Sequence, residues 1–253
     1  MAAIGSTTLG IAEQVGGITL IWLQILGAIM IPRFDSRETW RNLYKVGVKS
    51  YPIVVLTALF TGAIMVIQSG HFVRQTGATG LLGWAAGFAV LAEIGPVLIG
   101  LMFSGRVGAN NTAELGTMTV TEQVSALRAL AIDPIRYLVV PRFLSMIVML
   151  FLLTCLGDLF ALVGGALTSQ FLLDVDWRHF YQSVVAAQLL NEFLVGLVKA
   201  LFFGMTISVI SCYFGLGVTG GAPGVGRAVN ASVVASAIGI FVVDFAVTYA
   251  ANL

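Results

Sequence analysis

Five ionisable side chains interrupt long apolar stretches of the sequence. They are Glu93, Asp158, Glu192, Lys199 and Asp244. A charge inside a bilayer costs about 2.5 to 3.5 kcal/mol on insertion scales, so such residues are default candidates for a functional site. Glu192 and Lys199 are seven positions apart, two helical turns on one face, which favours a polar cavity that both side chains flank. The alternative is that the five charges neutralise one another in structural pairs.

Glu93 has the most distinctive surroundings of the five residues. It begins the run Glu-Ile-Gly-Pro96. A proline in a helix removes a backbone donor and can break or kink the helix. The pattern therefore places a carboxylate beside an irregular backbone in the middle of an apolar segment.

A polar segment, residues 106–142, separates two apolar stretches and carries helix signals. Thr119-Val-Thr-Glu122 has the spacing of a capping box, which predicts a short helix over residues 120–131. Asp133-Pro134 should end that helix, with Asp133 capping the next helix and Pro134 in its first turn. A short, rigid helix between two membrane spans is typical of a coupling element that seats in a partner protein. The alternative is a solvated connector.

Other motifs do not predict chemistry in this chain. Gly215-Leu-Gly-Val-Thr-Gly220 fits G-x-G-x-x-G, and residues 221–227 fit a phosphate loop only in part, because Arg227 replaces the lysine. Neither follows a strand, so neither has the context of a nucleotide site. Cys155 and Cys212 have no paired spacing, and the two histidines stand alone, so we predict no metal site and no catalytic residues.

The composition is that of a membrane protein. Of 253 residues, 58% are hydrophobic and only 10% are charged, whereas soluble domains carry about 25% charge. The net charge of +1 excludes the basic footprint of a nucleic-acid-binding protein. The chain starts without the basic segment of a secretory signal, so we expect no cleavage there.

Five segments have the length and apolarity of membrane spans. They are residues 53–69, 81–105, 143–167, 189–213 and 231–251. Residues 15–31 are apolar but short and end at Pro32-Arg33, which favours an interfacial or half-inserted helix over a sixth span. We therefore predict an all-α polytopic membrane protein with N-terminal interfacial helices over residues 1–50 and a five-span domain over residues 51–253.

The distribution of basic residues predicts the orientation, because Lys and Arg accumulate on the cytoplasmic side. Ten lie before the first span or in the two connections expected on the same side: Arg33, Arg37, Arg41, Lys45, Lys49, Arg106, Arg128, Arg136, Arg142 and Arg227. Only Arg74 and Arg178 lie in the opposite loops. We expect a cytoplasmic N-terminus and an external C-terminus. The five cations over residues 33–49 recur every fourth position, which suggests a helix along the anionic leaflet, anchored by Trp40 and Tyr44.

About 50 consecutive residues closely resemble the MlaE/YrbE permease family. The matching runs are Glu93 to Leu98, Ser104 to Ala109, Ala113 to Met118, Thr121 to Leu127 and Ile132 to Arg142. A looser resemblance extends from about Arg33 to Asp244. One departure is Ala92, which stands where many relatives have a basic residue.

The resemblance implies the membrane subunit of an ABC transporter that moves phospholipids or related lipids between the bacterial inner membrane and a periplasmic MCE protein. It implies that the chain forms a homodimer. The expected partners are a cytoplasmic ATPase that binds ATP and Mg, a periplasmic MCE hexamer and, as an optional further subunit, a small STAS-domain protein. The residues then expected to couple to the ATPase are Glu114, Glu122, Leu127, Arg128 and Asp133. The expected lipid pocket comprises Phe88, Leu91, Glu93, Val97, Leu98, Glu192, Lys199 and Asp244. No enzymatic activity and no cofactor are expected in this chain.

Two other functions fit the same residues. A proton-coupled secondary transporter of an amphiphilic substrate would use Glu93, Glu192 and Asp244 as a relay, although the chain has no duplicated halves. A membrane anchor that only docks a periplasmic partner would not need the short helix of the polar segment.

Overall fold

The structure is a bundle of long helices. The computed structural model describes residues 2–29, 36–76 and 82–253, and the regular elements in these ranges are all helical. The long helices are α1 (Ala2–Ile29), α2 (Ser36–Thr76), α7 (Val140–Leu172), α9 (Leu190–Leu216) and α10 (Gly221–Ala251). The shorter ones are α3 (Leu82–Ala89), α4 (Gly95–Phe103), α5 (Ala109–Val120), α6 (Gln123–Ala129) and α8 (Trp177–Ala186). Three π-helical turns, Val90–Ile94, Ser104–Gly108 and Ile135–Val139, join or precede them.

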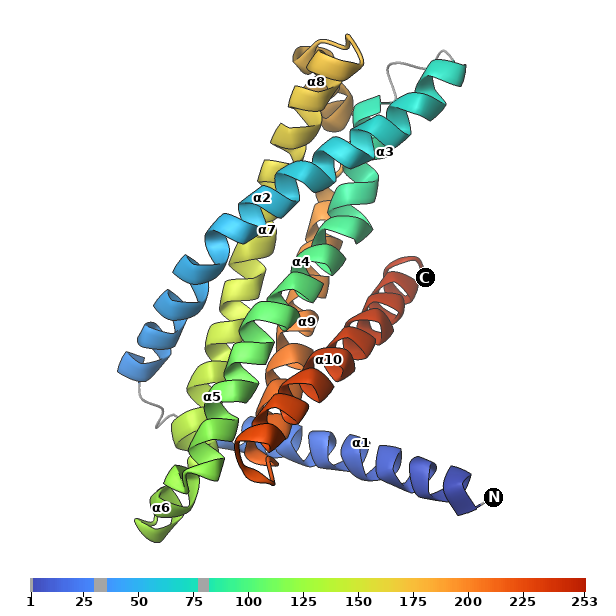
Figure 1. Cartoon of the computed structure of the whole chain (residues 1–253). Helices are drawn as coiled ribbons and strands as arrows, with labels where there is room; N and C mark the ends of the chain where they lie inside the picture. Colours follow the sequence, from blue (N-terminus) through green and yellow to red (C-terminus); the bar gives the residue numbers. More distant parts are fainter. Residues whose placement is uncertain (1, 30–35, 77–81) are drawn as a thin grey trace.

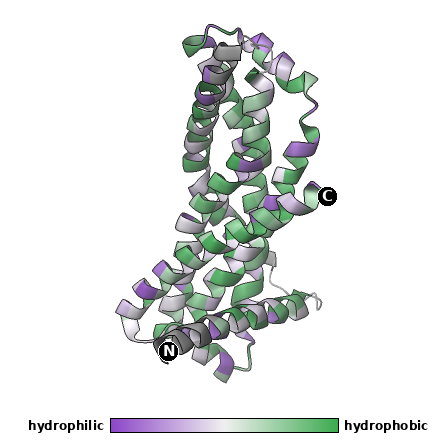
Figure 2. Ribbon diagram, turned by 90° about the vertical axis from the view of Figure 1, so that its right-hand side faces the viewer, coloured by the Kyte–Doolittle hydropathy of each residue, from purple (hydrophilic) through white to green (hydrophobic). Residues whose placement is uncertain are grey.

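The five predicted spans are confirmed as helices, and each extends further than its apolar core. Residues 82–120 form one continuous helical segment, as do residues 135–172. Residues 106–120, expected in a polar connection, continue the helical path of α4 through α5. Apolar residues predominate along the long helices (Figure 2). Six helical segments of the described chain, α1 among them, are long and apolar enough to cross a membrane.

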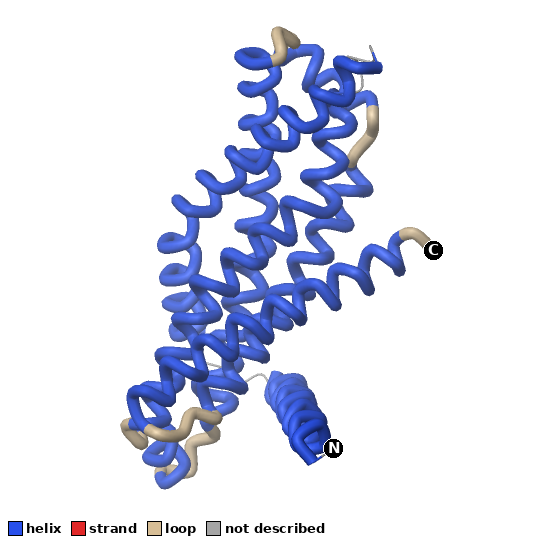
Figure 3. The backbone as a smooth tube through the Cα atoms, turned by 45° about the vertical axis from the view of Figure 1, so that its right-hand side comes forward, coloured by secondary structure: helices blue, strands red, loops and turns tan. Residues whose placement is uncertain are grey.

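The connections gather at the two ends of the bundle (Figure 3). We call these the α6 end, where α6 lies and α10 begins, and the α8 end, where α8 lies and α9 begins (Figure 1). Helix α1 lies across the α6 end instead of running along the bundle, and the three views agree on this placement. Ile25 of α1 is fully buried, whereas Val15, Leu20 and Leu23 are more than half exposed. Such a helix suits the interfacial position that the sequence predicts.

The basic stretch near the N-terminus differs from the expected separate helix. Residues 36–49 form the first part of α2, which continues past Pro52 without interruption. The domain boundary expected after residue 50 therefore falls inside a helix. Arg33 lies outside the described residues.

Small residues bring the helix backbones close together, as the spacing of Gly83/Gly87 and Gly196/Ala200/Gly204 predicts. A Cβ on Gly196 would overlap the carbonyl oxygen of Leu91, and one on Gly204 would lie 2.8 Å from the Cα of Ile147. The central core lies between α2, α4, α7, α9 and α10. Its fully buried side chains include Phe103, Leu150 and Phe203.

Candidate functional site

Three of the five ionisable residues of the apolar segments meet in one cluster. The side chain of Lys199, on α9, is fully buried, and its Nζ lies 2.6 Å from Oε2 of Glu93 and 2.9 Å from Oδ1 of Asp244. Glu93 belongs to the π-helical turn Val90–Ile94, and Asp244 belongs to α10. Thr248, one turn further along α10, donates a hydrogen bond of 3.1 Å to Oε1 of Glu93. We call Glu93, Lys199, Asp244 and Thr248 the charged cluster.

Pro96 explains how the backbone takes part in this cluster. In a regular helix the carbonyl of Ala92 would accept a hydrogen bond from the N–H of residue 96, but proline has no N–H. The amide of Gly95 bonds instead to the carbonyl of Val90, which makes the π-helical turn. The freed carbonyl of Ala92 accepts a hydrogen bond of 2.8 Å from Nζ of Lys199. The irregular backbone expected at Pro96 therefore takes the form of a π-helical turn, and it leaves a free carbonyl that accepts a hydrogen bond from the buried ammonium group of Lys199.

The charged cluster is open on one side. It contains one cation and two carboxylates, and the side chain of Glu93 is 38% exposed while that of Lys199 is 0% exposed. Glu93 can therefore interact with a molecule outside the bundle while Lys199 holds it in place. Carboxylate oxygens with this exposure accept hydrogen bonds from a polar headgroup or from water.

An apolar groove lies on α9 and α10, the two helices that carry Lys199, Asp244 and Thr248, and the groove residues adjoin the charged cluster without including any of its four members. It has a volume of about 550 Å³, and its walls include Val198, Phe202, Val243 and Val247. Val198 and Val243 directly precede Lys199 and Asp244 in the sequence, and Val247 precedes Thr248. The same two helices thus carry an apolar groove and the polar groups of the cluster. This combination fits an amphiphilic ligand.

The remaining residues of the expected pocket lie elsewhere. Leu91 is buried against Gly196, and Val97 packs on the central core. Phe88 is 43% exposed and stacks on Trp84. None of these three residues lines the apolar groove.

Leu98 and Glu192 are also apart from the charged cluster. Leu98 borders a small cavity beside Asp158, whose two carboxylate oxygens are buried and have no hydrogen-bond partner in the described chain. Glu192 is partly exposed and has no ion pair among the described residues. The structure therefore brings Glu93, Lys199 and Asp244 together but not Glu192, because Lys199 reaches across to α10 instead of along α9.

The capping box predicted at Thr119–Glu122 is wrong. Thr119 lies in the last turn of α5, which ends at Val120, instead of starting α6, and the hydrogen of its hydroxyl is shared between the carbonyls of Leu115 and Gly215. Glu122 precedes α6 in a left-handed conformation, with φ of 61°, and makes no side-chain cap. A short helix does exist, but it is α6, Gln123–Ala129, shorter than the predicted 120–131.

The end of the α6 connection matches the prediction. Oδ1 of Asp133 accepts a hydrogen bond of 2.9 Å from the amide of Ile135, and Pro134 starts the helix that leads into α7. Leu127 packs on the core, whereas Arg128 is exposed. Two apolar residues that the sequence analysis missed, Leu130 and Ile132, are 71% and 38% exposed at this turn. Together they give the tip of the connection an exposed apolar surface.

Glu114, expected to face a partner, interacts within the chain. Its carboxylate forms ion pairs with Lys45 of α2 and with Arg142 of α7, the latter at 3.3 Å. Asn110 donates a further hydrogen bond of 2.8 Å. Glu114 thus ties three helices together near the α6 end.

Known proteins resemble the chain over nearly its whole length. The profile of the permease MlaE family matches residues 39–250. A probable ABC transporter permease protein of Rickettsia felis is 37% identical over 97% of this chain and 95% of its own length. One of Synechocystis is 38% identical over 88% of this chain and 84% of its own length. The chloroplastic protein TRIGALACTOSYLDIACYLGLYCEROL 1 of Arabidopsis thaliana is 35% identical over 90% of this chain and 65% of its own length. The family profile and these relatives, which match nearly the whole chain, show that the chain belongs to the MlaE permease family.

Proposed function

We propose that this chain is the transmembrane permease subunit of an ABC transporter that moves phospholipids or related lipids between the inner membrane and a periplasmic MCE protein. The observation that carries the proposal is the apolar groove on α9 and α10 beside the charged cluster. The groove suits acyl chains, and the exposed carboxylate of Glu93 suits a polar headgroup. The name of the Arabidopsis relative contains that of a glycolipid, which supports a lipid substrate.

The proposed orientation places the α6 end in the cytoplasm and the C-terminus in the periplasm. Nine cations of the described chain belong to segments at the α6 end, and two, Arg74 and Arg178, belong to the α8 end. The positive-inside rule favours this orientation. A separate cytoplasmic ATPase, which supplies ATP and Mg, would then meet α6, and the MCE hexamer would meet the α8 end.

The proposed assembly contains two copies of this chain. Five large apolar residues form a stripe along α10: Val234, Ile238, Phe241, Phe245 and Tyr249. Each is more than half exposed. The spacing of three or four residues puts them on one face of the helix. A second copy of the chain that covered this stripe would put two apolar grooves and two charged clusters near one two-fold axis.

Filling the apolar groove should block transport without loss of assembly. Val198→Trp and Val247→Trp each place a large side chain where acyl chains would lie, so we expect at least a tenfold lower rate of lipid transfer in proteoliposomes. Val163→Trp on α7, whose side chain is 41% exposed outside the groove, is the matched control and should transport normally. Normal transport by both groove variants would contradict the proposed site.

The α6 connection should be needed for the ATPase to bind. Leu130→Asp puts a charge on an apolar contact surface, so we expect at least tenfold less ATPase to co-purify with the permease. Val185→Asp on α8 changes a similarly exposed residue, 74% exposed, at the opposite end and should leave co-purification unchanged. Equal recovery of the ATPase with Leu130→Asp and with the unmodified chain would place the contact elsewhere.

A further inference from the structure

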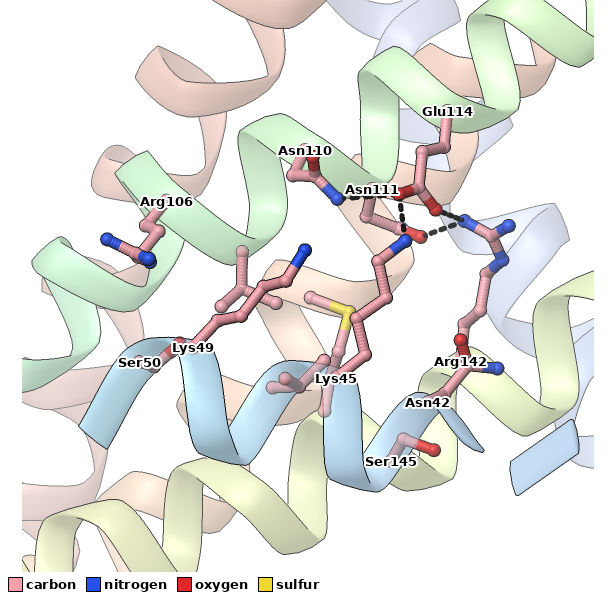
Figure 4. Close-up of a pocket in the computed structure, with 13 residues that line it drawn as sticks. Asn42, Lys45, Lys49, Ser50, Arg106, Asn110, Asn111, Glu114, Arg142 and Ser145 are labelled. Atoms are coloured by element: carbon pink, nitrogen blue, oxygen red, sulfur yellow. Dashed lines mark hydrogen bonds and ion pairs between the residues drawn. The ribbon is translucent and has the colours of Figure 1, made fainter. Parts of the chain in front are cut away.

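A second cavity lies near the α6 end, away from the apolar groove. It is enclosed by α2, by the segment from the π-helical turn Ser104–Gly108 into α5, and by α7 (Figure 4). Its volume is about 340 Å³. Its charged lining comprises Lys45, Lys49, Arg106, Glu114 and Arg142, and its buried polar lining comprises Ser50, Asn111 and Ser145. We call it the basic cavity.

The basic cavity has more positive charge than its own carboxylate can neutralise. Four of the lining side chains are cations, and Glu114 is the one acid among them. Lys45 and Arg142 both pair with Glu114. The side chains of Lys49 and Arg106 have no hydrogen bond or ion pair to any described residue, and Figure 4 shows the ammonium group of Lys49 extending into the space between α2 and α5. Two cations thus remain for an anionic ligand.

Ser50 is a second, independent sign of a ligand. Its side chain is 2% exposed, it lines the basic cavity, and its hydroxyl has no hydrogen-bond partner among the residues that the structure describes. A buried hydroxyl without a partner is unfavourable by about 1 to 3 kcal/mol, so such groups are usually satisfied by water or by a ligand. An oxygen-rich anion between Lys49 and Arg106 would supply the missing acceptor.

The exposed residues of α2 indicate where this anion comes from. Trp40, Tyr44 and Tyr51 lie on one face of α2 and are 74%, 69% and 44% exposed. Trp and Tyr favour the headgroup level of a membrane, so the adjacent basic cavity lies at that depth. Its lining also contains Val46, Val107 and Met146, which suit the glycerol and first methylenes of a lipid better than a free ion.

We propose that the basic cavity binds the phosphate of an anionic phospholipid from the leaflet at the α6 end. Arg106 and Lys49 contact the phosphate, and Ser50 donates a hydrogen bond to one of its oxygens. Phosphate accepts such charge-assisted hydrogen bonds from Arg and Lys. The bound lipid contacts α2, α5 and α7 next to the ion pairs of Glu114. This proposal does not rest on the proposed transport function, because the apolar groove and the basic cavity share no residue.

Native mass spectrometry of the full chain in detergent tests the proposal, with phosphatidylglycerol and phosphatidylcholine as probes. We expect the chain to retain phosphatidylglycerol in preference to phosphatidylcholine. Lys49→Ala and Arg106→Ala should each weaken phosphatidylglycerol binding about tenfold. Arg41→Ala is the matched control, because Arg41 is also a cation of α2 but pairs with Glu38 outside the cavity, and it should change the affinity less than twofold.

Two results would overturn the proposal. Equal retention of phosphatidylglycerol by the double variant Lys49→Ala/Arg106→Ala and by the unmodified chain would exclude the basic cavity as the lipid site. Displacement of the lipid by millimolar inorganic phosphate, with the ion then bound in its place, would assign the site to free phosphate. Because Lys49 and Arg106 are exposed and their side chains form no hydrogen bond or ion pair within the described chain, the lipid-free double variant should unfold at the same temperature as the unmodified chain.

Discussion

Lys199→Met should destabilise the protein by about 3 to 5 kcal/mol and abolish lipid transport. The side chain of Lys199 is fully buried between Glu93 and Asp244, and it also donates a hydrogen bond to the carbonyl of Ala92. Removing one partner of a buried ion pair leaves the other charge without compensation, which accounts for an effect of this size. Here two carboxylates and one carbonyl would lose their common partner. Thermal unfolding in detergent measures the loss of stability.

The neutral triple variant separates charge compensation from the function of the site. Lys199→Met combined with Glu93→Gln and Asp244→Asn removes all three charges, so most of the lost stability should return while transport stays absent. Lys45→Met is the control for an ion pair nearer the surface, because Lys45 and Glu114 are both partly exposed. A pair of that kind contributes about 0 to 1 kcal/mol. If Lys199→Met unfolded at the temperature of the unmodified chain, the charged cluster would not stabilise the fold.

The sequence identified the three charged members of the charged cluster, but neither Thr248 nor the arrangement of the four residues. Apolar flanks alone mark Glu93, Lys199 and Asp244 as functional candidates inside membrane spans, because a charge is rare in such surroundings. The spacing of Glu192 and Lys199 suggested Glu192 as the neighbour of Lys199, which is wrong. Spacing along the sequence relates only residues of the same helix, whereas both partners of Lys199 belong to other helical segments. The contacts of Lys199 span 106 residues to Glu93 and reach a third helix at Asp244. Such pairs depend on how helices pack, which periodicity does not encode. Pro96 was the one residue in the sequence that pointed to a contact of Lys199, because its missing N–H leaves the carbonyl of Ala92 free to accept a hydrogen bond.

Helix ends at the α6 connection were predicted less well than the spans. Thr119 and Glu122 have capping-box spacing, yet α5 continues as far as Val120. The hydroxyl of Thr119 therefore bonds back to the carbonyl of Leu115, as threonines inside helices do. Polar composition over residues 106–120 suggested a connection, but packing against α9 and α10 and the ion pairs of Glu114 keep this segment helical. Local residue types could not reveal that tertiary support.

Gly62→Ala should destabilise the protein through the contact between α2 and α7. A Cβ on Gly62 would overlap the carbonyl oxygen of Ala161, and a Cβ on Gly164 would overlap that of Leu59. The two glycines thus form a reciprocal close contact between the backbones of α2 and α7. Because a backbone carbonyl cannot rotate away as a side chain can, the helices must separate. Overpacking of this kind costs about 1 to 3 kcal/mol, and we expect Gly164→Ala to behave alike.

Gly226→Ala provides the matched control, because a Cβ at Gly226 of α10 meets no atom within 4 Å. Replacing a helical glycine by alanine at an open position stabilises a protein by about 0.4 to 1 kcal/mol, since the unfolded chain loses freedom. The same substitution should therefore lower the unfolding temperature at Gly62 and leave it equal or higher at Gly226. The double variant Gly62→Ala/Gly164→Ala should lower the free energy of unfolding by less than the sum of the two single variants. Helices that one methyl group has already separated have room for the second. Unchanged stability of Gly62→Ala would mean that α2 and α7 are not in backbone contact, and the position of α2 beside the basic cavity would then have to be revised.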